Sequence, residues 1–148
     1  IGELVVTPLQ VESMPLIRYA TGDMVMKIAE NCDCGRNSIR IGPVIGRKKQ
    51  MLKIKGTSIY PQHIQEAMNT LGVSEYIIEA QNDEFGNDQV CIKISEDIEI
   101  NSSEIQLKLR DHLQIKLEIQ QISASVLLQK KFPKESRKPI IFHDLRSI

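Results

Sequence analysis

The chain has 148 residues, of which 41% are hydrophobic and 26% are charged, the balance typical of a globular protein with a buried core. Its length allows one domain, or one domain with a smaller appendage, and excludes a large multidomain protein. Lys plus Arg and Asp plus Glu both number 19, so the net charge is zero and we expect neither nucleic acid nor an anionic membrane as a partner.

Three cysteines, without a secretory segment or a run of 18 apolar residues, predict a reducing, cytoplasmic location. The first residue is Ile1 rather than Met, and an apolar run begins at Leu4. We therefore expect the chain to be a segment of a longer protein.

The first third is rich in strand-forming residues and turns. Proline and glycine separate three apolar stretches, which predict short antiparallel strands at 3–6, 14–19 and 24–29. A loop with two cysteines follows, and the charged cluster at 47–50 (RKKQ) is the expected domain boundary.

After residue 50 the pattern changes to alternating strands and helices. Apolar spacing and end signals predict a helix at 61–71 and a second helix that runs to about residue 118. Asn101, Ser102 and Ser103 are candidate N-cap residues of the second helix, and Ser103 and Gln106 have the spacing of a capping box. Alternation of apolar and polar residues predicts strands, which we place at 51–55, 76–81, 89–95 and 122–128. A basic turn at 129–138 and a short apolar tail complete the chain. This order is the split βαβ pattern of an α+β fold with both helices on one face of the sheet.

Two short stretches have residues suited to nucleotide chemistry. Asp23 follows Gly22 at a predicted strand-to-strand turn, where its carboxylate either accepts the hydroxyls of a ribose or completes an Asx turn. Arg47 begins a basic stretch, and the planar, forked donors of its guanidinium suit phosphate and ribose oxygens. Gly56, further along this stretch, lets a bulky ligand approach the backbone. The alternative for this stretch is a solvated linker between domains.

The remaining candidates are a basic loop and a cysteine pair. Lysines and arginine at 130–138 form either a lid that carries a lysine to a phosphate or carboxylate, or a mobile basic tail. Cys32 and Cys34 are separated by one residue, shorter than the usual zinc spacing, and are either half of a zinc site or two reduced loop thiols.

In their order and spacing these motifs resemble the C-terminal third of adenylate-forming enzymes, specifically phenylacetate-CoA ligases, over essentially the whole chain. Segments 2–7 (GELVVT) and 15–19 (PLIRY) resemble the GELV and P-x-I-R-Y strands of that family, and 19–23 (YATGD) resembles its Y-R-T-G-D. Segment 46–61 (GRKKQMLKIKGTSIYP) is similar to G-R-x-D-D-M-L-I-I-R-G-x-N-V-F-P, and 132–138 (FPKESRK) is similar to P-R-S-E-G-K. The CDCGR segment resembles a C-x-C-G-R found in many of these ligases.

The resemblance implies roles for individual residues. Asp23 would bind the ribose of ATP, and Arg47 would contact the nucleotide. Lys49 would be the hinge, and Lys138 would be the catalytic lysine. The CoA channel would be lined by Gly56, Thr57 and Ser58. Lys49 stands where the subfamily usually has Asp, Ala20 replaces Arg in the first motif, and Arg137 replaces the usual Gly before the lysine.

The resemblance also implies an architecture and an activity. Residues 1–48 would be the last strands of a large N-terminal domain, and 49–148 a mobile C-terminal lid. The full-length enzyme would use ATP, Mg²⁺ and CoA to convert phenylacetate or a related aryl or acyl acid into its CoA thioester through an acyl adenylate, releasing AMP and pyrophosphate.

We expect the fragment alone to be inactive, a homodimer to be compatible with the fold, and zinc to be restricted to the cysteine pair. The alternatives are a free-standing ligand-binding or dimerisation module without catalysis, and an adenylating ligase whose acceptor is not CoA.

Overall fold

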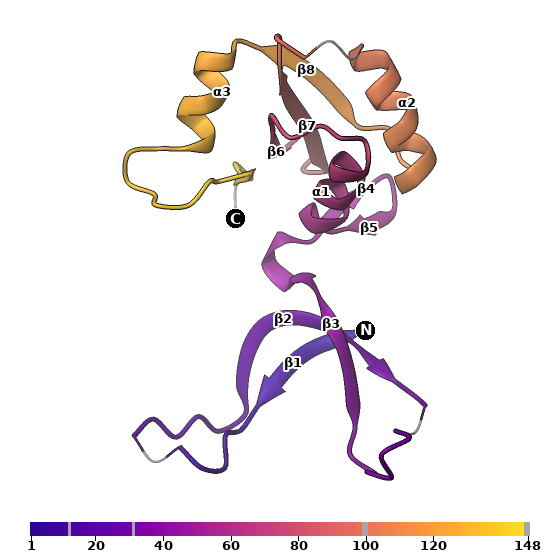
Figure 1. Cartoon of the computed structure of the whole chain (residues 1–148), viewed down its shortest axis with the longest axis vertical. Helices are drawn as coiled ribbons and strands as arrows, with labels where there is room; N and C mark the ends of the chain where they lie inside the picture. Colours follow the sequence, from indigo (N-terminus) through magenta and orange to yellow (C-terminus); the bar gives the residue numbers. More distant parts are fainter. Residues whose placement is uncertain (12, 31, 99–100, 147–148) are drawn as a thin grey trace. The chain divides into compact units, whose positions relative to one another are not determined.

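The computed structural model describes residues 1–11, 13–30, 32–98 and 101–146, and the chain divides into two units, Ile1–Met51 and Leu52–Ile148 (Figure 1). The first unit is an antiparallel sheet in the order β1 (Gly2–Val6), β2 (Tyr19–Ile28) and β3 (Arg40–Arg47), followed by the short 3₁₀ helix η1 (Lys48–Gln50). The second unit contains all three described α-helices and the remaining strands.

One of the three strands predicted for the first unit is wrong. The segment before Tyr19 is irregular, because Pro15 lacks a donor for strand pairing and Arg18 adopts a left-handed backbone with φ of 51°. The backbone N–H of Arg18 donates instead to Thr7 Oγ1 at 2.9 Å. The third strand of the sheet is β3, which the sequence analysis does not predict.

The first unit buries little apolar surface of its own. Val25 is the buried hydrophobic residue among its described residues, whereas Met26, Ile41 and Val44 on the same sheet are exposed.

The second unit is a mixed α+β arrangement with its own core. Its elements are β4 (Leu52–Ile54), β5 (Thr57–Ile59), α1 (Pro61–Thr70), β6 (Tyr76–Asn82), β7 (Asp88–Ser95), α2 (Ser102–Leu113), β8 (Glu118–Ile122), α3 (Ala124–Lys131) and β9 (Phe142–Asp144). A four-stranded sheet has the order β8-β7-β6-β9, in which β6 and β7 are antiparallel and the outer strands are parallel to their neighbours, while β4 and β5 form a separate hairpin.

The core lies between one face of the sheet and helices α1 and α2. Ile78 and Ala80 of β6 face Ile64 of α1 and Leu109 of α2 in one buried cluster. Glu79, which alternates with these strand residues, lies on the opposite face and pairs with α3. The structure confirms the predicted first helix and the hairpin of β6 and β7, and it adds a helix on the second face that the sequence analysis missed.

Three predictions in the last third are wrong, namely the end of the second helix, its capping box and the strand at 122–128. The second helix ends at Leu113, because Gln114 takes a left-handed conformation with φ of 57° and closes the helix. Asn101, one of the three candidate N-cap residues, is the N-cap, because its side chain accepts the N–H of Ser103. Gln106 donates to the carbonyl of Leu117 instead of forming a capping box.

The stretch 122–128 is not a strand. Strand β8 ends at Ile122, and the residues after it form α3, in which Leu127 and Lys131 face inwards one helical turn apart. Val126 and Leu128, which gave the alternating pattern, are exposed. In the described residues, no helix is both long and apolar enough to cross a bilayer.

Candidate functional site

Asp23 and Arg47 lie opposite each other on neighbouring strands of the first unit. They are register partners of β2 and β3, and Arg47 Nε donates to Asp23 Oδ1 at 2.9 Å. The Asp23 side chain is 23% exposed and that of Arg47 is 65% exposed. A partly exposed ion pair of this kind contributes at most about 1 kcal/mol to stability. The guanidinium and the carboxylate can therefore separate at little cost and bind the oxygens and hydroxyls of a ligand instead.

The backbone before Asp23 is kinked within a strand, and the predicted strand-to-strand turn at this position is wrong. Gly22 has φ of 77°, and the pairing of β1 with β2 shifts register between Glu3 and Val5. Thr21 Oγ1 donates to the carbonyl of Leu4 at 3.0 Å and accepts the N–H of Asp23 at 3.1 Å. The threonine and glycine of this motif therefore fix a bulge, and the bulge orients the carboxylate.

Lys49 lies in η1, two residues before the end of the first unit. Its neighbour Lys48 donates from Nζ to Glu3 Oε2 at 2.8 Å, and this hydrogen bond lowers the pKa of the Glu3 carboxyl. The start of η1 is thus fastened to β1, while the residues after Lys49 lead into the second unit.

The segment from Lys55 to Ser58 is a tight hairpin. Ile54 pairs with Thr57, and the two intervening residues, Lys55 and Gly56, have φ of 48° and 84°. Positive φ at both central positions is the geometry of a type I′ turn, which favours Asn followed by Gly. Gly56, Thr57 and Ser58 are all exposed, and a Cβ added at Gly56 would meet no atom within 4 Å, so the position is open to a ligand.

Lys138 lies in the segment that joins α3 to β9. Ser136 orders the backbone there, because its Oγ donates to the carbonyl of Lys138 at 2.7 Å and its N–H donates to the carbonyl of Pro133 at 3.0 Å. The Lys138 side chain is exposed and has no ion pair with any described residue. Its ammonium group is therefore available to an anion.

Two members of the predicted basic loop are not in a loop. Lys130 and Lys131 belong to α3, where Lys130 Nζ contacts Glu79 Oε1 at 2.6 Å and Lys131 Nζ donates to the carbonyl of Ser74 at 2.8 Å. They are structural contacts between the helix and the sheet, so only the residues after Phe132 remain as candidates for a mobile cationic segment.

Cys32 and Cys34 are both free thiols, with their Sγ atoms 2.8 Å apart. The hydrogen-bond contact with Cys32 lowers the pKa of Cys34. Within the described part of the chain, no cluster of three or more His, Cys, Asp or Glu side chains could hold a metal ion. A structural zinc needs four ligands, so the two thiols alone do not make a zinc site among the described residues.

Sequence reasoning missed a carboxylate that fastens the β4–β5 hairpin to the sheet. Asp88 Oδ2 accepts the backbone N–H of Lys53 at 2.6 Å, and Arg146 Nη1 lies 3.2 Å from the same carboxylate. Arg146 also contacts Asp144 at 2.7 Å, and the hydrogen bonds from Arg146 lower the pKa of Asp144. These residues are far apart in the sequence, and no local pattern signals their contact.

Comparisons with known proteins bear on the identity of this site. No protein family model matches the chain. The phenylacetate-coenzyme A ligase of Thermus thermophilus is 44% identical over 68 residues, which are 46% of this chain and 15% of that protein. The enzyme of the same name from Aromatoleum evansii is 33% identical over 84 residues, 55% of this chain and 18% of that protein. The matches lie in the C-terminal portion of these relatives, and this chain spans less than a fifth of their length.

Solved structures share the fold at lower identity. A 2-hydroxyisobutyryl-CoA ligase in the postadenylation state, in complex with 2-HIB-AMP, matches 88% of this chain and 29% of its own with a TM-score of 0.58 and 19% identity. The mixed α+β fold of this chain therefore matches the fold of an adenylate-forming ligase.

Proposed function

The chain resembles the C-terminal portion of phenylacetate-CoA ligases, and from this premise we propose that it is the C-terminal part of an ATP-dependent carboxylate-CoA ligase. The acid would be phenylacetate or a related aryl or acyl acid. The full-length enzyme would join this acid to AMP, release pyrophosphate, and transfer the acyl group to the thiol of CoA. Mg²⁺ bound with ATP would neutralise part of the phosphate charge.

The observation that carries the proposal is the 44% identity over 68 residues to a protein of that name. The geometry agrees with it, since Asp23 and Arg47, which the resemblance assigns to the nucleotide, form one ion pair across two strands. A partly exposed carboxylate can accept hydrogen bonds from ribose hydroxyls, and the guanidinium beside it can donate to phosphate oxygens.

In the first step, a carboxylate oxygen of the acid attacks the α-phosphorus of ATP and the bond to pyrophosphate breaks. Negative charge develops on the phosphate centre, and a cation held there stabilises it. We assign this role to Lys138, whose ammonium group has no ion pair among the described residues. One charge pair about 4 Å apart at an effective dielectric near 20 is worth about 4 kcal/mol, or a rate factor on the order of a thousand.

In the second step, the CoA thiol attacks the acyl carbon and AMP leaves. We assign the CoA channel to the open hairpin of Gly56, Thr57 and Ser58. We assign the hinge to Lys49, where rotation would replace Lys138 with this hairpin at the reaction centre. The 3₁₀ helix with Lys49 ends next to the division between the two units, which is where such a hinge is needed.

The first unit is suited to be the edge of a larger domain. Its sheet exposes Met26, Ile41 and Val44 while burying Val25, and an exposed apolar surface of this kind is typical of a region that packs against another part of a protein. This agrees with the expectation that residues 1–48 end the large domain and that 49–148 form the lid.

The test uses the full-length protein with Lys138→Ala, and Lys134→Ala as the matched control from the same exposed segment. Phenylacetate-dependent exchange of pyrophosphate into ATP measures the first step, and conversion of preformed phenylacetyl adenylate by CoA measures the second. We expect Lys138→Ala to slow exchange on the order of a thousandfold and to leave the second step within about threefold, while the control retains both.

Each other result has a definite meaning. If the full-length protein exchanges pyrophosphate with no acid of an aryl and acyl panel, the ligase proposal is wrong and a binding module without catalysis is favoured. If adenylates form but CoA does not consume them, the acceptor is not CoA. If Lys138→Ala exchanges as fast as the parent, the catalytic lysine is misassigned.

A further inference from the structure

Cys32 and Cys34 lie in the connection from β2 to β3, and none of the roles proposed above uses them. Their Sγ atoms are 2.8 Å apart, and Asp33 alone separates the two residues in the sequence. Cys34 is exposed and Cys32 is half-buried, so a small reagent in the solvent can reach the pair. Two thiols in contact at the surface can react with each other.

A tight turn holds the two thiols together. The N–H of Gly35 donates to the carbonyl of Cys32 at 3.0 Å, so residues 32–35 form a β-turn with Asp33 and Cys34 at its centre. Gly35 continues the chain with φ of 77°, a conformation that glycine adopts without strain. This backbone keeps the two side chains near each other before any bond joins them, and such proximity accelerates a reaction between them.

The surroundings of Cys34 favour its reactive form. The hydrogen-bond contact with Cys32, and next to it the backbone N–H of Arg36, lower the pKa of the Cys34 thiol. The thiolate is the nucleophilic form of cysteine, and an exposed thiolate is open to attack on a reagent. We therefore expect Cys34 to react first, with Cys32 beside it as the second thiol.

Cys91 provides a contrast within the same chain. It is buried in β7, and this burial raises the pKa of its thiol to about 11. A buried thiol that stays protonated reacts slowly with reagents in the solvent. Cys91 is thus an internal reference against which the reactivity of the pair can be measured.

We propose that Cys32 and Cys34 are a redox modification site that hydrogen peroxide converts into an intrachain disulfide. The Cys34 thiolate attacks one oxygen of the peroxide, the O–O bond breaks, hydroxide leaves, and the sulfur becomes a sulfenic acid. The Cys32 sulfur then attacks the sulfenic sulfur, the S–S bond forms, and the oxygen leaves as water. In total, two thiols lose two electrons and two protons, and the peroxide becomes two molecules of water. An excess of a small thiol reverses the bond by exchange.

The experiment treats the reduced 148-residue chain with hydrogen peroxide, blocks the remaining thiols with iodoacetamide, and identifies tryptic peptides by mass spectrometry. Cleavage after Lys27 and Arg36 yields peptide 28–36, which contains both thiols of the pair and not Cys91. The variants are Cys34→Ser and Cys32→Ser, because serine removes one thiol and keeps the size of the side chain. Cys91→Ala is the control, since it removes the one cysteine outside the pair.

In the wild type and in Cys91→Ala, we expect peptide 28–36 to become two hydrogens lighter, to take up no iodoacetamide, and to recover both thiols with dithiothreitol. Cys32→Ser should instead accumulate a sulfenic acid at Cys34, which dimedone captures as an adduct. Cys34→Ser should react at least about tenfold more slowly than the wild type, because it lacks the thiolate that attacks the peroxide. Cys91 of the wild type should lag behind the pair by a similar factor.

Several results would overturn this assignment. One is a peptide 28–36 that still takes up two iodoacetamide groups after peroxide, and another is a disulfide that joins two chains, which non-reducing electrophoresis detects. Equal dimedone capture in the wild type and Cys32→Ser would remove Cys32 as the second thiol. Retention of one zinc ion per chain, with thiols that peroxide does not oxidise, would identify the pair as metal ligands. None of these results depends on ligase activity, so the adenylation test and this test can fail separately.

Discussion

Glu79 is a buried carboxylate of β6 that contacts one lysine of the sheet and one lysine of α3. Its carboxylate is 11% exposed and contacts Lys93 Nζ and Lys130 Nζ, each at 2.6 Å. We predict that Glu79→Gln lowers the free energy of unfolding of the second unit by about 2 kcal/mol at pH 7. The contact with Lys93, which is 19% exposed, accounts for most of this, since hydrogen bonds to charged groups contribute about 1.5–3 kcal/mol. The half-exposed Lys130 adds at most about 0.5 kcal/mol.

The predicted effect depends on pH in a definite direction. Burial of Glu79 raises the pKa of its carboxyl, but the hydrogen bonds from Lys130 and Lys93 outweigh it, so the pKa lies below the ordinary value of 4.5. A carboxyl whose pKa is lower in the folded state stabilises the fold above the unfolded value, and that contribution disappears as the pH falls through the folded pKa. The difference between wild type and Glu79→Gln should therefore be complete at pH 7 and shrink below about pH 4.5.

Urea unfolding followed by circular dichroism at 222 nm measures this difference. All described α-helices lie in the second unit, so the helical signal reports on that unit. Glu104→Gln is the matched control, because its salt bridge to Lys108 is half exposed and an exposed pair of this spacing is worth about 0.3–0.5 kcal/mol. Equal destabilisation by the two variants at pH 7, or a Glu79→Gln effect of the same size at low pH, would refute the reasoning.

Three further predictions concern the thiols, the core and a helix end. At about pH 8, iodoacetamide should modify Cys34 well before Cys91, because burial raises the pKa of Cys91 to about 11, and mass spectrometry of timed samples checks the order. Ile92→Ala should lower the stability of the second unit by about 2–5 kcal/mol, since Ile92 is fully buried, whereas Val44→Ala on the exposed sheet of the first unit should leave the urea midpoint of the helical signal unchanged. Gln114→Gly should raise that midpoint, by about 0.5–1 kcal/mol in stability, because glycine adopts a φ of 57° without strain.

The sequence predicts best where the signals are local. Pro61 and the apolar spacing after it define α1, and strict alternation defines β7. The end of α2 was missed because Leu117 continues the four-residue spacing of the helix, although it is buried as the lead-in to β8. Helix α3 was missed because its alternating apolar residues are on the solvent side. At both positions tertiary packing determines the secondary structure, whereas the local sequence pattern predicts a different one.

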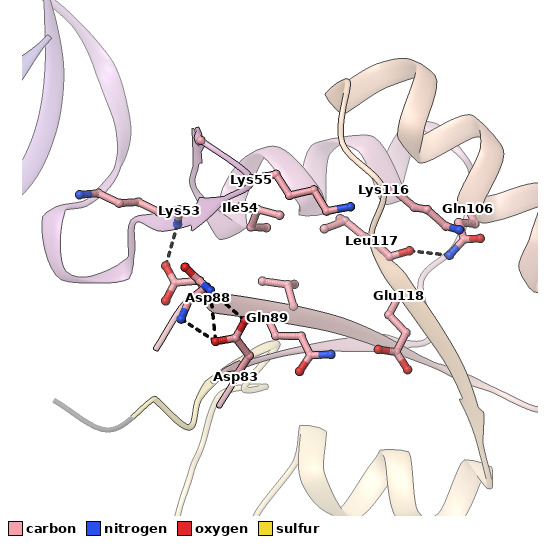
Figure 2. Close-up of a pocket in the computed structure, with 13 residues that line it drawn as sticks. Lys53, Ile54, Lys55, Asp83, Asp88, Gln89, Gln106, Lys116, Leu117 and Glu118 are labelled. Atoms are coloured by element: carbon pink, nitrogen blue, oxygen red, sulfur yellow. Dashed lines mark hydrogen bonds between the residues drawn. The ribbon is translucent and has the colours of Figure 1, made fainter. Parts of the chain in front are cut away.

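The same distinction between local and tertiary signals applies to the candidate site. The motifs identify Asp23 and Arg47 separately, but their contact depends on the register of β2 and β3, which irregular pairing shifts. The β4–β5 hairpin is held in the same way, because Asp88 of β7 accepts the backbone N–H of Lys53 (Figure 2) and no short motif contains both residues. Sequence can thus name residues of the right chemistry, while strand register and packing determine which of them share a site.

The two candidate regions rest on different scaffolds, and this decides where each proposal can be tested. Asp23 and Arg47 lie on a sheet of the first unit in which Val25 is the buried hydrophobic residue among those described. The hairpin of Lys55, by contrast, is fastened through Asp88 to a sheet with a complete apolar core. The stability predictions for the second unit can therefore be tested on the 148-residue chain, whereas the proposed roles of Asp23, Arg47 and Lys138 in adenylation have to be tested on the full-length protein.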